Sequence, residues 1–244
     1  MLQARGLQQM FSGRAVSVVS VVSGPSAPDS HPFVLALARE LSRDGGRVWL
    51  AASSAAIARE LGCRPLLPWR AGLPLAPQII STGQGYGLIH APQGMAGDTA
   101  LSGAVNDARS CDFLLFDGGR FSLGEAPIDA AANQVLVILL GCQDGESGYA
   151  LVKALRQSQS PARVLLVGEA ADSIGQTAAQ FLGWRVESRQ VEAGLCQIGN
   201  KSPVTSSNTL SAMTNLRWVL SRISQNYQSR AAHGGGSEGA KKVC

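Results

Sequence analysis

The sequence predicts a doubly wound α/β fold, a mostly parallel sheet with helices on both faces, and three observations support this. First, strand patterns and amphipathic helix patterns alternate along most of the 244 residues. Second, apolar runs at 15–22 and 47–51 flank a helix pattern, and such a strand–helix–strand unit is typical of parallel pairing. Third, 45% hydrophobic and only 16% charged residues suit a full core and exclude a disordered chain or a coiled coil.

The expected elements follow one another in a regular order. A short amphipathic helix is expected at 2–12, and a helix of this length needs something to pack against. After the first strand, Pro32 suits the first turn of a helix that continues to Arg43 and ends at Gly45-Gly46. Further strands are expected at 87–90, 112–117, 135–140, 163–167 and 184–187, and further helices at 53–61, 148–157, 173–182 and 208–227.

By composition the chain divides into three segments. A short N-terminal helical segment is expected at 1–13, the α/β domain at 14–228, and a disordered Gly-rich tail at 229–244. The last helix of the domain carries apolar residues at helical spacing, with Arg217 and Arg222 beside them. Two basic residues are few for a membrane-binding helix, so packing against the sheet is favoured and membrane contact is expected to be weak or indirect.

Several classes of protein are excluded by simple features. The longest apolar run, at 135–140, is far short of the ~20 residues that cross a bilayer, and the N-terminus lacks the pattern of a signal peptide. The five cysteines form no C-x-x-C pair and the three histidines are scattered, so no metal site is indicated. Lys and Arg are spread along a chain of net charge +4, which does not indicate nucleic-acid binding. These features predict a cytoplasmic protein.

The loop after the first strand, at 23–31, has the position of a phosphate-binding loop but the wrong chemistry. Such a loop needs converging backbone N–H groups, a Lys for the phosphates and a hydroxyl for Mg²⁺. Here Pro25 and Pro28 remove two donors, Asp29 adds a negative charge, and no Lys or Arg is present. His31 and His90 have no acid partner that spacing alone would identify, so a surface or loop role is expected for each.

Over residues 15–182 the sequence resembles the MinD/ParA class of P-loop ATPases, whose loop follows the pattern K-G-G-x-G-K-[ST]. The resemblance puts Gly24 before the motif, Pro25 at the signature Lys, Asp29 at the last Gly, Ser30 at the phosphate-binding Lys and His31 at the Mg²⁺-binding hydroxyl. Asp117 stands at the acid of the later strand. It could equally be a carboxylate that caps the turn after that strand.

The resemblance therefore implies a protein that has kept the fold and lost the catalytic charges. The family also carries an Asp-x-Asp-like pair after its second strand, where Ala52 and Ser54 stand here. Losing both lysines, the hydroxyl and this acid pair removes most of the charge stabilisation that phosphoryl transfer needs. A pseudo-ATPase without a cofactor is expected, as a monomer or a nucleotide-independent dimer. The alternatives are an active ATPase that binds ATP and Mg²⁺ with other basic residues such as Arg120, or a related module for cellulose secretion or for chromosome or plasmid positioning.

Within this class the N-terminus is similar to the D-Q-A-x-x-L-R segment of the flagellar-number regulators (FlhG, also called FleN). Gln3, Ala4 and Leu7 match that segment, whereas Leu2 and Gln8 depart from it. The resemblance implies that this helix binds a FlhF-like signal-recognition-type GTPase, with Gln3 near the partner's nucleotide and with Leu7 and Met10 as apolar anchors. It further implies flagellar switch or regulatory proteins as partners, and a location at the cell pole or membrane periphery through them.

Overall fold

The computed structural model describes residues 16–52, 57, 60–63, 79–90, 111–121, 135–159, 162–191 and 216–225. Its strands are β1 (Ser17–Ser23), β2 (Val48–Ala52), β3 (Ile80–Ser81), β4 (Gly87–His90), β5 (Phe113–Arg120), β6 (Val135–Leu140), β7 (Arg163–Gly168) and β8 (Glu187–Gln190). Its helices are α2 (Ser30–Arg43), α5 (Gly145–Gln157) and α6 (Ala171–Leu182), followed by a helix at 216–225.

The strands form one mostly parallel sheet of order β3-β4-β2-β5-β1-β6-β7-β8, which confirms the predicted fold class. Among the described strands, only the two-residue β3 runs antiparallel to its neighbour, β4. The predicted parallel relation of β1 and β2 is correct, but the two strands are not neighbours, because β5 lies between them and pairs with both. All seven residues of β1 are buried, and a strand of that kind belongs in the centre of a parallel sheet.

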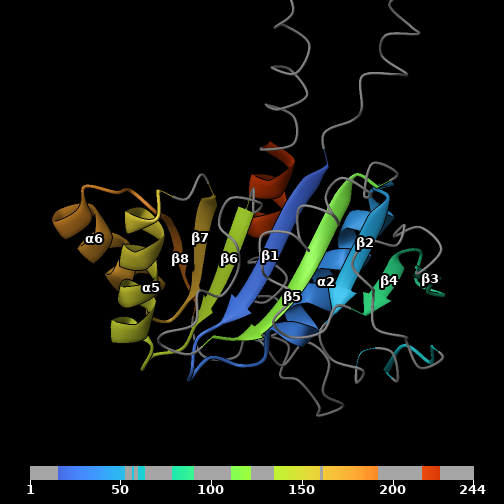
Figure 1. Cartoon of the computed structure of the whole chain (residues 1–244), viewed down its shortest axis with the longest axis horizontal. Helices are drawn as coiled ribbons and strands as arrows, with labels where there is room; N and C mark the ends of the chain where they lie inside the picture. Colours follow the sequence, from blue (N-terminus) through green and yellow to red (C-terminus); the bar gives the residue numbers. More distant parts are fainter. Residues whose placement is uncertain are drawn as a thin grey trace, which may run out of the picture.

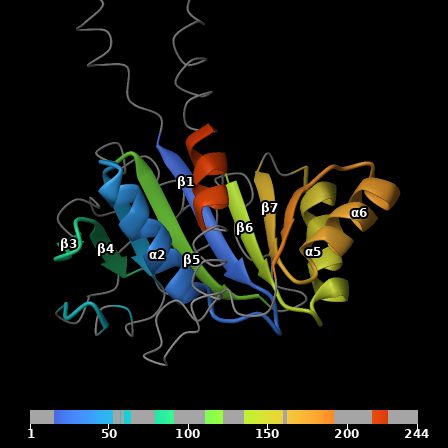
Figure 2. The same ribbon diagram turned by 180° about the vertical axis from the view of Figure 1, so that it is seen from behind.

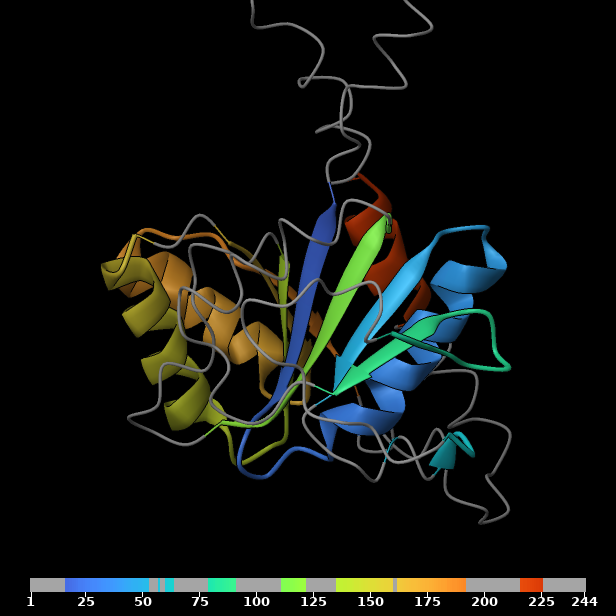
Figure 3. The same ribbon diagram turned by 45° about the vertical axis from the view of Figure 1, so that its right-hand side comes forward.

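Helices cover both faces of the sheet, as Figure 3 shows: α5 and α6 lie on one side, and α2 and the helix at 216–225 on the other. The strand β6 shows how a continuous apolar run produces this arrangement. Its residues Val135, Val137 and Leu139 belong to the core beneath α2, whereas the alternate residues belong to the core beneath α5 and α6. Successive side chains of a strand point to opposite faces, so a strand covered on both faces is apolar throughout.

The helix at 216–225 packs on the body of the protein, as expected. Its residues Leu216, Val219 and Ile223 are almost fully buried in the same core as α2, and Figure 2 shows this helix on the same face of the sheet as α2. The four-residue and three-residue spacings of these residues place them on one helical face. In the described part of the chain, no helix has both the length and the apolar character that a bilayer crossing requires.

Several boundaries differ from the prediction. The strand β5 continues three residues beyond Asp117 through a register shift, and Gly119 at φ +64° supplies the left-handed conformation. The strand β8 begins at Glu187 instead of residue 184, because Gly183 and Trp184 still belong to the end of α6: the Trp184 amide donates to the carbonyl of Ala178. The helices α5 and α6 begin two or three residues early.

The predicted N-terminal helix, with Gln3, Ala4, Leu7 and Met10, lies outside the described residues. So does the predicted Gly-rich tail at 229–244.

Candidate functional site at the carboxyl edge of β1, β5 and β6

The carboxyl ends of the parallel strands meet at one edge of the sheet, the lower edge in Figure 1. From β1 the chain passes to β2 on one side of the sheet, and from β5 it crosses β1 to reach β6 on the other. Ligands of open α/β sheets bind at such a topological switch point. The loop between β1 and α2, the end of β5 and the turn between β6 and α5 all lie there.

The backbone amides of the loop after β1 are already used or are missing. The Gly24 amide donates to the Leu139 carbonyl over 2.8 Å, the Ser26 amide to Asp144 over 2.8 Å, and the Ala27 amide to the Gly24 carbonyl over 3.2 Å. Pro25 and Pro28 have no amide hydrogen. From residue 24 to residue 28, therefore, no backbone donor is left to converge on an anion.

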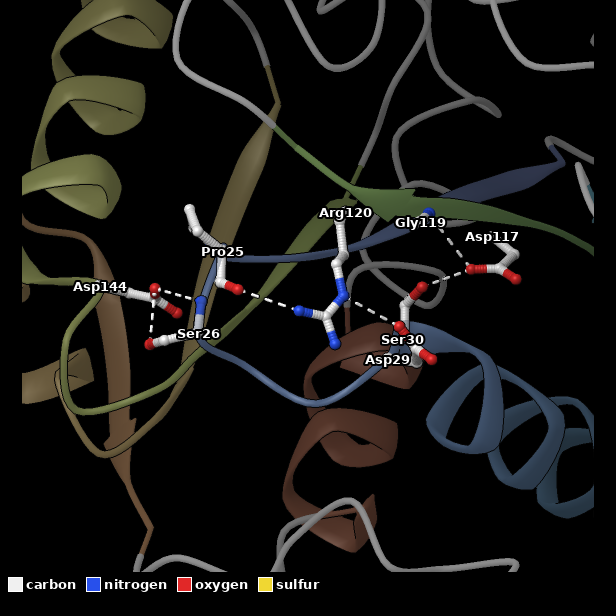
Figure 4. A network of polar contacts seen from close by, with 8 residues as sticks. All are labelled: Pro25, Ser26, Asp29, Ser30, Asp117, Gly119, Arg120 and Asp144. Atoms are coloured by element: carbon white, nitrogen blue, oxygen red, sulfur yellow. Dashed lines mark hydrogen bonds and ion pairs between the residues drawn. The ribbon is translucent and has the colours of Figure 1, made fainter.

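The carboxylate of Asp144 holds this loop against the neighbouring turn (Figure 4). Asp144 is 1% exposed and accepts hydrogen bonds from the Ser26 amide, from Ser26 Oγ over 2.8 Å and from the Gly141 amide over 2.7 Å. It stands at the N-cap position of α5, yet its side chain makes no capping hydrogen bond there. The tertiary contact with the loop has replaced the usual capping role.

Two glycines make room for the contacts between Asp144 and the loop. A Cβ at Gly24 would overlap the Asp144 carboxylate, and a Cβ at Gly141 would lie 2.5 Å from Ser26 Oγ. Gly24, which the resemblance placed beside the phosphate motif, is thus required by an internal contact. Sequence reasoning missed Asp144. An Asp directly before a helix at the carboxyl edge was the available signal, and it reads as an ordinary helix cap.

Arg120 reaches across the loop from the end of β5 (Figure 4). Its Nε donates to Asp29 Oδ1 over 3.0 Å and its Nη1 to the Pro25 carbonyl over 2.9 Å. Both charged side chains are largely exposed, so the ion pair itself contributes little to stability. It has a clear electrostatic consequence, however: the guanidinium is paired with a carboxylate at the place where the fold would receive phosphate.

Ser30, His31 and Asp117 come together where α2 begins. Ser30 Oγ donates to Asp117 Oδ1, and the Gly119 amide donates to the same oxygen over 3.3 Å. The second contact is the turn-capping role considered for Asp117. The expectation that His31 lacks an acid partner is wrong: its Nδ1 lies 3.5 Å from Asp117 Oδ2 and its Nε2 lies 3.0 Å from Glu60 Oε2. Both acids are remote in sequence, so spacing could not reveal them.

The residues present do not fit a Mg-ATP site. Such a site needs free loop amides, an uncommitted cation and a hydroxyl for the metal. Here the amides from residue 24 to residue 28 are hydrogen-bonded within the protein or absent, Arg120 is paired with Asp29, and Ser30 donates to Asp117. The part of the chain that the structure describes also contains no cluster of three or more His, Cys, Asp or Glu residues that could hold a metal ion.

Comparison with solved structures supports the fold, whereas comparison with family models and curated proteins gives no match. No protein-family model matches this sequence, and no curated protein matches it either. Among solved structures, the chain resembles MinD cell division protein from Aquifex aeolicus with a TM-score of 0.53 and 13% identity, covering 93% of this chain and 100% of that one.

Two other solved structures are similar to the same degree. Cobyrinic acid a,c-diamide synthase from Mycobacterium smegmatis, solved with an ATP analogue and magnesium, has a TM-score of 0.54 at 13% identity and covers 84% of this chain and 94% of its own. A plasmid partition protein from Borrelia burgdorferi has a TM-score of 0.54 at 9% identity, covering 85% and 99%. At these identities the likeness shows a shared fold.

Proposed function

We propose that this protein is a pseudo-ATPase with the MinD/ParA fold, and that it acts by binding other proteins. One observation carries the proposal: from Gly24 to Pro28 every backbone N–H is either hydrogen-bonded within the protein or absent. A phosphate-binding loop works through several amides that point at one anion. Binding a triphosphate here would require the loop to give up its contact with Asp144 and to move the Asp29–Arg120 pair apart.

Charge supports the same proposal. Phosphoryl transfer depends on fixed positive charge around the transferred group. In this loop the exposed Asp29 brings a negative charge, and the guanidinium nearest to it is neutralised by that same residue. A bound polyphosphate would therefore meet repulsion from Asp29 before it could pair with Arg120.

Isothermal titration of the full-length protein with Mg-ATP tests the proposal. No binding is expected at millimolar nucleotide, and the cobyrinic acid a,c-diamide synthase from M. smegmatis, whose structure holds an ATP analogue, is the positive control. A dissociation constant in the micromolar range would overturn the proposal and favour the active-ATPase alternative. A matched variant, Arg120→Ala, distinguishes the two further: it would weaken nucleotide binding if Arg120 served the phosphates, and would change nothing if no nucleotide binds.

We further propose that the protein regulates flagellar number or placement, in the manner of the FlhG regulators. The resemblance of the N-terminal segment, with Gln3, Ala4 and Leu7, supports this role, and the shared MinD-type fold is compatible with it. The expected partner is a FlhF-like GTPase, bound by Leu7 and Met10 in an apolar groove.

A GTPase assay tests this second part. The full-length protein, or a peptide of residues 1–12, is added to FlhF from the same organism, with Gln3→Ala as the matched variant. Stimulated GTP hydrolysis that falls with Gln3→Ala is expected. If the protein neither binds FlhF nor stimulates its GTPase activity, the alternatives are favoured: a related module for cellulose secretion or for chromosome or plasmid positioning.

A further inference from the structure

The imidazole of His31 lies between two carboxylates that come from different parts of the fold. Asp117 stands in β5, the central strand next to β1, and Glu60 follows β2 in a helical turn that includes Ile57. The His31 side chain is 21% exposed, that of Asp117 is 5% exposed, and that of Glu60 is 55% exposed. His31 thus connects the start of α2 with a buried acid on one side and a solvated acid on the other.

The number of protons on the ring decides how many of these contacts can exist. An imidazolium has two N–H donors, and each can point at one carboxylate. A neutral imidazole has one N–H and one lone pair, so it can donate to only one acid and must turn a lone pair toward the other. The two acids therefore favour the protonated ring, and the pKa of His31 is raised from its usual value of 6.5, chiefly by the hydrogen bond to Asp117 and with a smaller contribution from Glu60, against the opposing effect of burial.

The two contacts do not respond equally to loss of the proton. Asp117 keeps the Ser30 hydroxyl and the Gly119 amide as donors, so it remains held when His31 is neutral. For Glu60, His31 is the one side-chain partner within the described structure. The neutral ring keeps its single N–H on Asp117 Oδ2, which receives neither of those two donors, because a buried carboxylate oxygen without a donor costs more than a solvated one. The contact with Glu60 is then the one that breaks.

We propose that His31 is a proton-controlled tether between α2 and the turn that carries Glu60–Cys63. Below the pKa of His31 the tether is closed and the turn is held against the carboxyl edge of the sheet. Above that pKa the tether opens, while Ile57, which is fully buried, keeps the start of the turn in the core. The segment that changes is therefore Glu60–Cys63, beside the loop that follows β1. This inference goes beyond the proposed function, because it holds whether or not the loop binds nucleotide.

The proposal explains why a histidine is tolerated in the first turn of a helix. Positive charge is unfavourable at a helix N-terminus, and the first turn of α2 contains no acidic residue that could offset it. Asp29, which precedes the helix, is directed toward Arg120. The compensation for the imidazolium comes instead from Asp117 and Glu60, the two charged groups that face it from the elements packed around it.

The test is an NMR titration of the histidine ring signals in the full-length protein without nucleotide. The wild type is expected to show a pKa for His31 above 6.5, and Glu60→Gln is expected to lower that pKa. Glu146→Gln, an exposed glutamate in the first turn of α5, is the matched control and should leave it unchanged. A pKa of His31 at or below 6.5, or one that does not respond to Glu60→Gln, would overturn the proposal.

Hydrogen exchange supplies a second measurement that a merely structural role would not affect. After correction for the intrinsic pH dependence of exchange, the amides at 60–63 should lose protection as pH rises through the pKa of His31. In Glu60→Gln their protection should be independent of pH, because the neutral amide can contact either form of the ring. Equal pH dependence in both proteins would refute the tether. Binding of Mg-ATP in calorimetry together with the expected NMR and exchange results would overturn the pseudo-ATPase proposal and still support the His31 tether.

Discussion

Asp144 offers the sharpest test of how the loop after β1 is held. Replacing Asp144 by Ala removes one buried carboxylate and the three hydrogen bonds that it accepts, two from Ser26 and one from Gly141. Hydrogen bonds to a charged group contribute about 1.5–3 kcal/mol each, so the contacts together could supply several kcal/mol. The loss should be smaller than that sum, because the partners differ in their access to water.

The exposure of each partner sets the expected magnitude. Ser26 is exposed, so water can replace the carboxylate at both its amide and its hydroxyl. Gly141 is buried, and its amide is left without an acceptor, which costs about 1–3 kcal/mol. Adding a remainder for the two rehydrated contacts, we expect Asp144→Ala to lower the free energy of unfolding by about 2–4 kcal/mol.

Urea unfolding followed by tryptophan fluorescence measures this change, since the chain contains four tryptophans. Gln143→Ala is the matched control, because Gln143 lies in the same turn and is exposed; its effect should stay within about 0.5 kcal/mol. If Asp144→Ala is as stable as the control, the carboxylate does not hold the loop. In that case the Ser26 amide is not committed to Asp144 and stays open to another acceptor, which removes the support for the pseudo-ATPase proposal.

Two further predictions concern other buried positions of the fold. Gly168 has φ +139°, and a Cβ there would overlap the backbone oxygen of Leu140, so Gly168→Ala should lower the free energy of unfolding by more than about 3 kcal/mol or prevent folding. Gly183 has φ +60° with open space around it, so the control Gly183→Ala should lower it by only about 1 kcal/mol. Equal losses for the two variants in urea unfolding would contradict this reasoning. Burial raises the pKa of the Cys111 thiol to about 12, whereas Cys142 is exposed. A thiol reagent at pH 8 should therefore modify Cys142 in the native protein and Cys111 only after unfolding, as detected by peptide mass mapping. Rapid labelling of native Cys111 would show that this end of the strand is open to solvent.

The sequence predicted the elements of the sheet well because their local patterns are strong. The run at 135–140 is apolar at every position, and the structure places a strand there with the predicted bounds. Boundaries failed where a tertiary contact or a glycine changed the local outcome. Gly119 lets β5 pass Asp117 and carry Arg120 to the loop, and the turn after α6 uses Trp184 before β8 can begin. Sequence patterns do not contain the register of a neighbouring strand, which decides where β5 ends.

The candidate site was likewise predictable from the sequence only in part. The amino-acid sequence alone determined that the loop after β1 has two prolines, an acid and no lysine, because donors and charges are properties of the residues themselves. Only the tertiary structure decided what occupies the loop's remaining hydrogen-bonding groups. Asp144 is 118 residues from Ser26 and Arg120 is 91 residues from Asp29, and no local pattern records which distant side chains the crossovers of a parallel sheet bring to one edge.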